Sequence, residues 1–189
     1  MMAKHFLLTG PPGCGKTTVL QSVLAGLREA NPTVALRGFW TEEIRERGTR
    51  VGFGIETISG TAGTLARAGL PSPYRVGRYG VDLSSFEAVG VAEVEAALEE
   101  VARGQPIILA IDEIGKMELF SERFRGAVER AFSEVSHVVA TIMQRSHPFA
   151  DALKARADVT VIVVTPGNRE ELPAAVLSRL RRGRRDLPG

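Results

Sequence analysis

The sequence predicts an α/β protein in which a mostly parallel sheet is covered by helices on both faces. Three observations predict this class. A glycine-rich loop at residues 10–17 joins an apolar segment to a helical pattern, strand-like segments alternate with helix-like ones, and residues 107–111 are all apolar. An apolar run without alternation is typical of a central strand that is buried on both faces. With 189 residues and no internal repeat or linker, the chain is expected to form a single domain over residues 1–189.

The first element is the glycine-rich loop with its flanking segments. Residues 6–8 are typical of a short buried strand, and residues 18–30 carry apolar residues at helical spacing. The loop between them fits the Gly-x4-Gly-Lys-Thr spacing of a phosphate-binding loop. The expected nucleotide-binding residues are Gly10, Pro11, Pro12, Gly13, Cys14, Gly15, Lys16, Thr17 and Thr18.

The chemistry of this loop follows from its backbone. Glycines allow successive N–H groups to point at phosphate oxygens, and the N-terminus of the helix adds partial positive charge. The catalytic Lys16 would reach the β- and γ-phosphates, and the Thr17 hydroxyl would ligate Mg²⁺. The loop therefore predicts binding of a nucleoside triphosphate with magnesium.

The next elements are a second strand, a hairpin and a loop. Residues 34–40 are typical of a strand. Apolar residues that alternate with polar or small ones on both sides of Gly48 predict an antiparallel hairpin within residues 41–58, which would extend the parallel sheet. Residues 59–73 are rich in Gly, Thr and Pro and are typical of a surface loop.

The second half of the chain alternates between helices and strands, as parallel sheets with crossover helices do. Helix periodicity and Gly104, which ends a helical pattern, delimit these elements. We expect strands at 75–81, 107–111, 138–142 and 159–164, a turn at 82–85, and helices at 91–103, 121–135, 149–156 and 169–180.

An acidic pair, Asp112 and Glu113, follows the buried strand at 107–111. A buried strand would deliver these carboxylates to the carboxyl edge of the sheet, where ligands bind in open α/β folds. Asp112 is then expected to hold Mg²⁺ opposite Thr17. Glu113 would orient the attacking water as a general base, so Lys16 and Glu113 are the expected catalytic residues.

Phosphoryl transfer needs further positive charge near the transferred group. The candidates at strand ends are Lys116, Arg145 and Arg169, and the candidates in the hairpin are Arg45, Arg47 and Arg50. None of them stands in a pattern that identifies an arginine finger. We therefore expect turnover well below the enzyme median of about 10 s⁻¹.

Composition limits the partners of the chain. The net charge of +2 arises from five arginines within residues 179–189, without which the charge is −2. We expect this end to form a basic, disordered tail from about residue 181, and nucleic acid is not an expected partner. No apolar run approaches the roughly 20 residues that cross a bilayer, and a single cysteine suits a reducing cytoplasm. The sequence leaves the oligomeric state open, with a monomer as one possibility.

Segments along nearly the whole chain resemble the cancer-related nucleoside-triphosphatase (THEP1-type) family. They are Gly10-Pro11-Pro12-Gly13, Gly15-Lys16-Thr17-Thr18, residues 38–43, 51–53, 76–79 and 81–83, residues 111–120 (IDEIGKMELF), and Asn168-Arg169. Trp40 stands where the family typically has tyrosine. The resemblance implies a three-layer, RecA-like P-loop fold. It also implies slow, Mg²⁺-dependent hydrolysis of ATP, GTP and other triphosphates to diphosphates, with loose base choice.

Two other functions remain open. The same loop would serve a nucleotide or nucleoside kinase, although the link at 143–149 is short for the arginine-rich lid that such kinases commonly have. A regulatory switch would also bind triphosphate, but the chain has no Asn-Lys-x-Asp signature for guanine.

Overall fold

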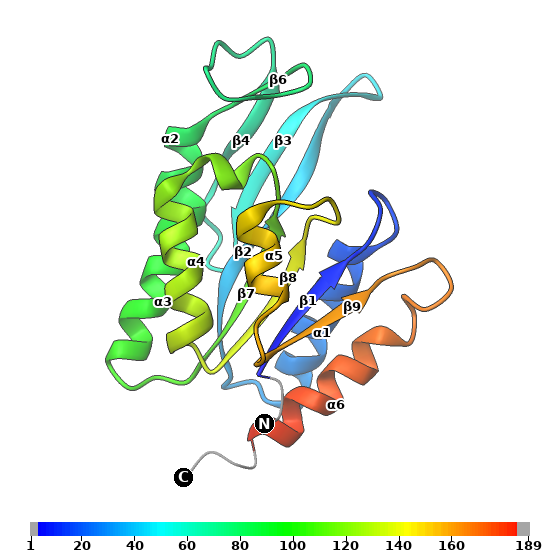
Figure 1. Cartoon of the computed structure of the whole chain (residues 1–189), viewed down its shortest axis with the longest axis vertical. Helices are drawn as coiled ribbons and strands as arrows, with labels where there is room; N and C mark the ends of the chain where they lie inside the picture. The colour runs from blue at the N-terminus through cyan, green and yellow to red at the C-terminus, as the bar shows by residue number, and fades with distance from the viewer. Residues whose placement is uncertain (1–3, 185–189) are drawn as a thin grey trace.

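The computed structural model describes residues 4–184, and side chains up to residue 181. Within this range the strands form a nine-stranded sheet in the order β5-β6-β4-β3-β2-β7-β8-β1-β9 (Figure 1). The strands are β1 (His5–Thr9), β2 (Ala35–Glu46), β3 (Thr49–Thr57), β4 (Ala62–Ala68), β5 (Arg75–Val76), β6 (Tyr79–Val81), β7 (Ile107–Ile114), β8 (His137–Ile142) and β9 (Val159–Val163). The helical segments are α1 (Lys16–Ala30), α2 (Leu83–Phe86), η1 (Glu87–Val91), α3 (Ala92–Ala102), η2 (Glu118–Phe120), α4 (Glu122–Glu134), α5 (Pro148–Lys154) and α6 (Leu172–Arg184).

The sheet has a parallel half and an antiparallel half, which meet in β2. The first residues of β2, Ala35 to Phe39, pair in parallel with β7, and β7, β8, β1 and β9 continue the parallel half. From Phe39 to Glu46 the same strand pairs antiparallel with β3. The predicted hairpin extension of a parallel sheet is thus confirmed. The predicted end of the second strand at residue 40 is wrong, because one uninterrupted strand pairs with β7 at its start and with β3 along the rest of its length.

Two other expectations for the antiparallel half are wrong. Residues 59–73 are not a loop throughout, because β4 lies among them and pairs with β3 on one side and β6 on the other. Its small residues have low strand propensity, but Leu65 and Ala66 are buried and the two neighbouring strands satisfy its backbone. Residues 75–81 form two strands, β5 and β6, that reverse at Gly77, where a φ of 57° favours glycine.

The residues after β6 also differ from expectation. The predicted turn at 82–85 begins α2, whose N-cap is Asp82: its Oδ1 accepts the N–H of Ser85 at 3.0 Å. The π-helical segment η1 then leads directly into α3, so the helix predicted at 91–103 continues an earlier one. The predicted cap of α4 is confirmed, because Ser121 Oγ accepts the N–H of Phe124 at 3.0 Å.

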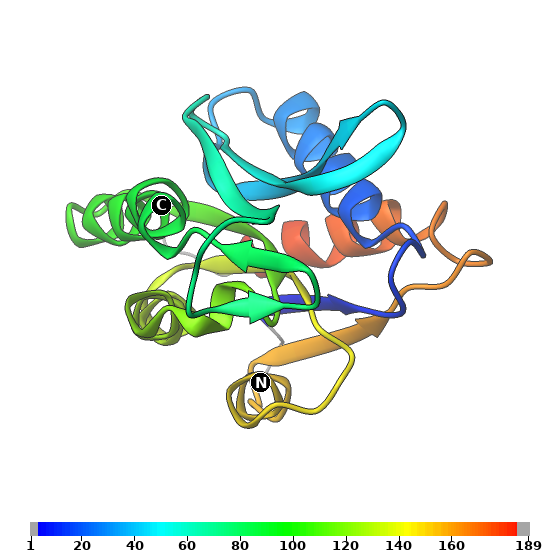
Figure 2. The same cartoon turned by 90° about the horizontal axis from the view of Figure 1, so that it is seen from above.

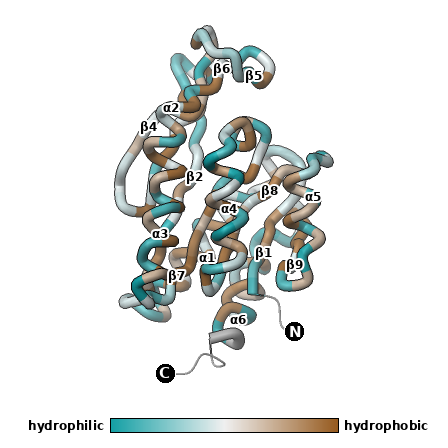
Figure 3. The backbone as a smooth tube through the Cα atoms, turned by 60° about the vertical axis from the view of Figure 1, so that its left-hand side comes forward, coloured by the Kyte–Doolittle hydropathy of each residue, from teal (hydrophilic) through white to brown (hydrophobic). Residues whose placement is uncertain are grey.

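Helices cover both faces of the parallel half, which makes three layers. Helices α1 and α6 lie on one face, and α3, α4 and α5 lie on the other (Figure 2). One apolar cluster lies between the sheet and α1 with α6, and a larger one between the sheet and α3 with α4. Figure 3 shows brown and teal alternating along α3 and α4, as expected for helices with one apolar face.

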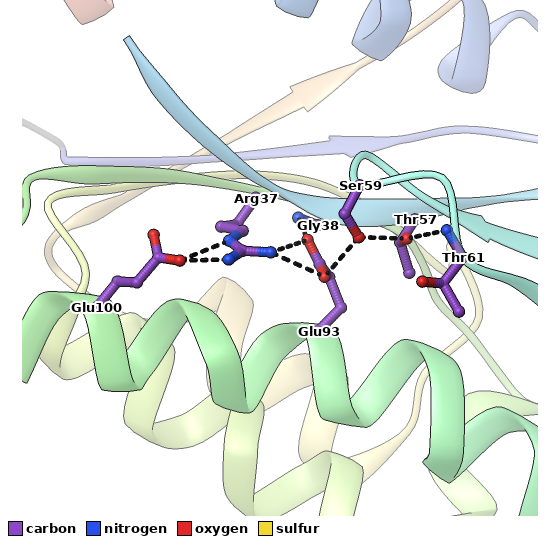
Figure 4. Close-up of polar contacts among 7 residues, drawn as sticks. All are labelled: Arg37, Gly38, Thr57, Ser59, Thr61, Glu93 and Glu100. Atoms are coloured by element: carbon purple, nitrogen blue, oxygen red, sulfur yellow. Dashed lines mark hydrogen bonds and ion pairs between the residues drawn. The ribbon is translucent and has the colours of Figure 1, made fainter.

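A buried carboxylate ties α3 to the sheet beside the junction of its two halves (Figure 4). Glu93 accepts hydrogen bonds from Arg37 Nη1 at 3.3 Å, from the backbone of Gly38 at 3.2 Å and from Ser59 Oγ at 3.2 Å. Arg37 also donates from Nε to Glu100 at 3.0 Å. A charge buried as deeply as that of Glu93 is stable only when it is paired and hydrogen-bonded, and this network provides both.

The end of the chain differs from expectation in one respect. Helix α6 continues to Arg184, so the basic tail expected from about residue 181 begins within a helix. Residues 185–189 of that tail lie outside the described residues. Among residues 4–184, no helix is long and apolar enough to cross a membrane.

Candidate active site

The loop between β1 and α1 has the backbone that a phosphate-binding loop needs. Gly10, with φ 153°, lies so close to the residue after β9 that a Cβ there would approach the carbonyl oxygen of Val164 to 2.6 Å. Gly15, with φ 106°, immediately precedes α1, and no side chain caps that helix. The N–H groups of its first turn therefore keep their capacity to bind an anion. Cys14 is buried beneath the loop and belongs to the apolar cluster around α1.

Lys16 folds back over its own loop. Its Nζ donates to the carbonyl oxygen of Gly10 at 3.1 Å and to that of Pro11 at 3.4 Å. These partners are neutral, so a phosphate oxygen could replace them with a stronger, charge-assisted bond. The ammonium group is thus held beside the place where the loop would bind the β- and γ-phosphates.

Thr17 and Asp112, 95 residues apart in the chain, are in direct contact. Thr17 Oγ1 donates to Asp112 Oδ2 at 2.7 Å, and Thr141 Oγ1, at the end of β8, donates to Asp112 Oδ1. The backbone of Thr41 in β2 also donates to this carboxylate. Asp112 is 2% exposed, and burial raises its pKa while the two threonine hydroxyls oppose the increase. Three neighbouring strands and α1 therefore meet at one buried carboxylate.

These oxygens suit a magnesium ion. Mg²⁺ prefers hard oxygen ligands and is commonly held by one or two protein groups together with substrate phosphates and waters. A hydroxyl and a carboxylate in contact beside a phosphate-binding loop fit that pattern. Within residues 4–184, no group of three or more His, Cys, Asp or Glu residues is placed to hold a metal ion. Thr17 and Asp112, which are in direct contact, are residues that could hold Mg²⁺ together with a bound triphosphate.

Glu113 lies next to this pair and lines the same cleft. Burial raises its pKa, the positive charge of Lys16 opposes the increase, and the negative charge of Asp112 adds to it. A general base works best when its pKa lies near the working pH, so a raised pKa favours proton transfer to this carboxylate. The geometry and the electrostatics both suit the predicted role of Glu113.

A cleft of about 760 Å³ follows the carboxyl edge of the sheet. It is lined by most of the expected nucleotide-binding residues, namely Gly10, Pro12, Gly13, Gly15, Lys16, Thr17 and Thr18, and by Asp112 and Glu113. The other two expected residues, Pro11 and Cys14, are not among those that line the cleft. Within the loop, the Cys14 N–H donates a hydrogen bond to the Pro11 carbonyl oxygen at 3.3 Å.

The cationic residues considered as charge stabilisers differ in whether they line the cleft. Lys116, Arg145 and Arg50 line the cleft. Arg169 does not line it; its side chain packs against Gly15, and its Nε donates to Glu170 at 3.2 Å. Of the remaining hairpin arginines, Arg45 bonds to Glu43 and to the backbone of Gly48, and Arg47 is in the turn; neither lines the cleft.

Comparison with known proteins agrees with this geometry. A family model described as NTPase matches residues 5–177, which include the whole candidate site. The chain belongs to the THEP1-type NTPase family. It is 45% identical to "Nucleoside-triphosphatase THEP1" of Thermotoga sp. (strain RQ2), over 93% of this chain and 94% of that protein. It is 42% identical to the "Cancer-related nucleoside-triphosphatase" of Homo sapiens, over 90% of this chain and 93% of that protein.

Solved structures of the NTPase family share the fold. The crystal structure of THEP1 from Aquifex aeolicus covers 94% of this chain and 99% of its own, with a TM-score of 0.83 and 36% identity. The solution structure of a human cancer-related nucleoside triphosphatase covers 95% and 98%, with a TM-score of 0.78 and 37% identity. The family that the sequence resembles and the predicted P-loop fold are therefore both confirmed.

Sequence reasoning missed several residues of this NTPase-family site. Thr41 and Thr141, which hold Asp112, lie on strands whose ends could not be aligned with β7 from the sequence. Glu118 lines the cleft although it is 4% exposed. Burial and the nearby Glu113 raise its pKa to about 8, and the backbone N–H groups of Glu118 and Gly115 oppose the increase only in part. The signal that could have found it is its position in the distinctive Met117-Glu118-Leu119 stretch.

Replacing Glu118 with glutamine is expected to remove a loss of stability that the wild type undergoes as the pH rises. The folded protein keeps the Glu118 proton up to about pH 8, whereas the unfolded chain releases it near the ordinary value of 4.5. Because the folded state binds more protons in this interval, the free energy of unfolding falls as the pH rises through it. Relative to wild type, Glu118→Gln should gain stability between pH 5 and pH 8, on the order of a few kcal/mol.

Urea unfolding of both proteins at pH 5 and pH 8 measures this difference. Burial lowers the pKa of His5 to about 4, which gives stability the opposite slope between about pH 4 and 6.5, but equally in both proteins. The comparison of the two proteins therefore isolates Glu118. Equal pH dependence in wild type and variant would contradict the prediction.

Proposed function

We propose that this protein is a magnesium-dependent nucleoside-triphosphatase that cleaves the β–γ bond of ATP, GTP and other nucleoside triphosphates. The observation that carries the proposal is the 2.7 Å contact between Thr17 and Asp112, beside the loop that holds Lys16 and in the same cleft as Glu113. A phosphate-binding loop, a magnesium-binding pair and a candidate base converge there, as hydrolysis of a metal-bound triphosphate requires.

Each residue of the site would have a separate role in hydrolysis. The loop N–H groups and the start of α1 would bind the α- and β-phosphate oxygens, and Lys16 would exchange its loop carbonyls for β- and γ-phosphate oxygens. Thr17 and Asp112 would hold Mg²⁺, which neutralises charge on the β- and γ-phosphates. Glu113 would orient a water in line with the γ-phosphorus and accept its proton. The water oxygen would bond to the γ-phosphorus as the bond from that phosphorus to the β–γ bridging oxygen breaks, which gives a nucleoside diphosphate and inorganic phosphate.

Low rate and loose base choice are part of the proposal. Lys116 and Arg145 line the cleft but are exposed, so their charges are partly screened by water. A positioned arginine finger accelerates this chemistry by 10³ to 10⁵, so a site without one should turn over slowly. The residues around the loop offer backbone and phosphate-binding groups, which do not distinguish one base from another.

Phosphate release from ATP, GTP, CTP and UTP tests the proposal. With Mg²⁺ we expect release from all four at rates within about tenfold of one another and well below 10 s⁻¹. Chelation of the metal with EDTA should abolish release, and added Mg²⁺ should restore it. The proposal fails if purified protein with Mg²⁺ releases no phosphate from any of the four, or if EDTA leaves the rate unchanged.

A further inference from the structure

A β-bulge turns one arginine of the β2–β3 hairpin into the cleft. The pairing of the two strands shifts register between Ile44 and Arg45, and Val51 of β3 is left over between two successive pairs. Side chains alternate between the two faces of a strand, so Arg50 and Phe53, three residues apart, would point to opposite faces of a regular strand. With the bulge, both line the cleft. Bulges commonly re-aim a side chain next to an active site in this way.

The acid that holds Arg50 is shared with a second arginine. Arg50 Nη1 donates to Glu43 Oε1 at 2.7 Å, and Arg50 Nε donates to Tyr79 Oη at 3.1 Å. The guanidinium also lies over the Phe53 ring, 5.1 Å from its centroid. Arg45 donates from Nε to the other carboxylate oxygen of Glu43, Oε2, at 2.9 Å. One negative charge therefore serves two guanidinium groups, and the cluster keeps an excess of positive charge.

This sharing makes Arg50 easier to release than an arginine of a buried ion pair. If the Arg50 guanidinium moves away, Glu43 keeps its bond to Arg45, so no carboxylate is left unpaired. The side chains of Arg50 and Glu43 are 42% and 37% exposed, so water can solvate the oxygen that Arg50 leaves. The bond to Tyr79 Oη joins Arg50 to a neutral group, and a charged phosphate oxygen would accept a stronger bond.

The position of Arg50 suits a contact with the γ-phosphate. The β2–β3 hairpin extends past the carboxyl ends of the parallel strands (Figure 1). Thr41 of β2 donates its backbone N–H to Asp112, and Glu43 lies two residues further along the same face, about 7 Å away at strand spacing. The Arg50 guanidinium rests beside Glu43. Rotation of this long side chain toward Asp112 would bring its guanidinium to the γ-phosphate of a triphosphate held by Lys16.

The other two cations of the cleft wall are less suited to this contact. Lys116 and Arg145 lie on loops, after β7 and after β8, whereas the backbone of Arg50 is fixed in a strand. A guanidinium group can also bind two phosphate oxygens with parallel bonds, which the single ammonium group of Lys116 cannot do. Strand support and donor geometry therefore both favour Arg50.

We propose that Arg50 is an arginine finger supplied by this chain itself, and that Glu43 restrains it in the resting enzyme. The proposal rests on the proposed hydrolysis of a triphosphate at the phosphate-binding loop. As the bond to the β–γ bridging oxygen breaks, negative charge develops on that oxygen and on the γ-phosphate oxygens, and the Arg50 guanidinium stabilises this charge. Because Glu43 competes for the same guanidinium, Arg50 contacts the phosphate for only part of the time, which keeps turnover low.

The turnover numbers of Glu43→Gln and Arg50→Met test the proposal. Glutamine accepts a hydrogen bond but carries no charge, so Glu43→Gln should turn over about three- to fivefold faster than wild type, the most that an exposed ion pair would hold back. Arg50→Met keeps an apolar stem beside Phe53 but loses the guanidinium, so turnover should fall about tenfold or more. In both variants the dissociation constant of a non-hydrolysable ATP analogue should change by less than about threefold, because Arg50 acts on charge that develops only in the transition state.

The matched controls are Glu46→Gln and Arg67→Met. Glu46 of β2 and Arg67 of β4 form another exposed ion pair of the antiparallel half, and neither lines the cleft. Both controls should turn over as wild type does, and circular dichroism checks that every variant is folded. The double variant Glu43→Gln/Arg50→Met should be no faster than Arg50→Met alone, because the restraint acts only through Arg50.

Three results would overturn the proposal while leaving the proposed hydrolysis intact. They are a Glu43→Gln variant no faster than Glu46→Gln, an Arg50→Met variant with wild-type turnover, and a double variant as fast as Glu43→Gln. If the wild type releases no phosphate from any triphosphate with Mg²⁺, the proposed function itself fails, and the role of Arg50 fails with it.

Discussion

Replacement of Lys16 by alanine is expected to abolish triphosphate binding and, with it, all phosphate release. Lys16 Nζ is held 3.1 Å from the Gly10 carbonyl oxygen, beside the place where the β- and γ-phosphates would lie. Among the described residues, the other cations that line the cleft are Arg50, Lys116 and Arg145, and none of them belongs to the phosphate-binding loop. Each charge-assisted bond contributes about 1.5–3 kcal/mol, so a lysine that serves two phosphates should change affinity at least a hundredfold.

The measurement is the dissociation constant of a fluorescent, non-hydrolysable ATP analogue with Mg²⁺, together with phosphate release. Lys4→Ala is the matched control, since it removes an exposed lysine outside the cleft and should bind as wild type does. Wild-type affinity in Lys16→Ala would show that the loop does not bind the polyphosphate as proposed.

Replacement of Glu113 by glutamine is expected to leave triphosphate binding nearly intact and to reduce turnover by 10²- to 10⁴-fold, the usual contribution of a general base. Glutamine has nearly the same shape, so the cleft and the neighbouring Asp112 should be undisturbed. Its amide cannot accept a proton from the attacking water. The substitution therefore removes the carboxylate whose pKa is raised by burial, and it leaves every phosphate-binding group of the loop in place.

Lys16→Ala is expected to change the dissociation constant, whereas Glu113→Gln is expected to change the turnover number. For Glu113→Gln the dissociation constant of the analogue should stay within about threefold of wild type, while the turnover number falls. Glu122→Gln serves as control, because Glu122 is 92% exposed on α4 and lies outside the cleft. If Glu113→Gln kept full activity, the base would have to be another group.

Much of the parallel half of the sheet could be predicted because its signals are local. Residues 107–111 form a run of apolar residues, and β7 indeed lies between β2 and β8, buried on both faces. The antiparallel half was harder to predict. β4 consists mainly of small and polar residues, and it is a strand because β3 and β6 pair with it, not because of its own propensity.

The phosphate-binding loop and the acidic pair could likewise be predicted. Glycines at a fixed spacing dictate the curl of the loop, and a buried strand carries Asp112 and Glu113 rigidly to its end. The positive charges could not be assigned in this way. Lys116, Arg145 and Arg169 are all placed just after strands, yet only the first two line the cleft, because the direction of a loop side chain depends on what packs against it.

The sequence by itself determined which groups are available for chemistry: a loop that can surround phosphates, a lysine and a threonine that follow it, and two carboxylates at a strand end. These are properties of short segments, in which spacing and backbone preference act directly. Only the tertiary structure decided that Thr41 and Thr141 hold Asp112, that Glu118 is buried in the cleft, and that Phe53, Leu65 and Val76 extend it beyond Glu113. Such neighbours come from strands that are distant in the chain, and the order in which strands pair depends on burial and hydrogen bonding across the whole sheet rather than on any one segment.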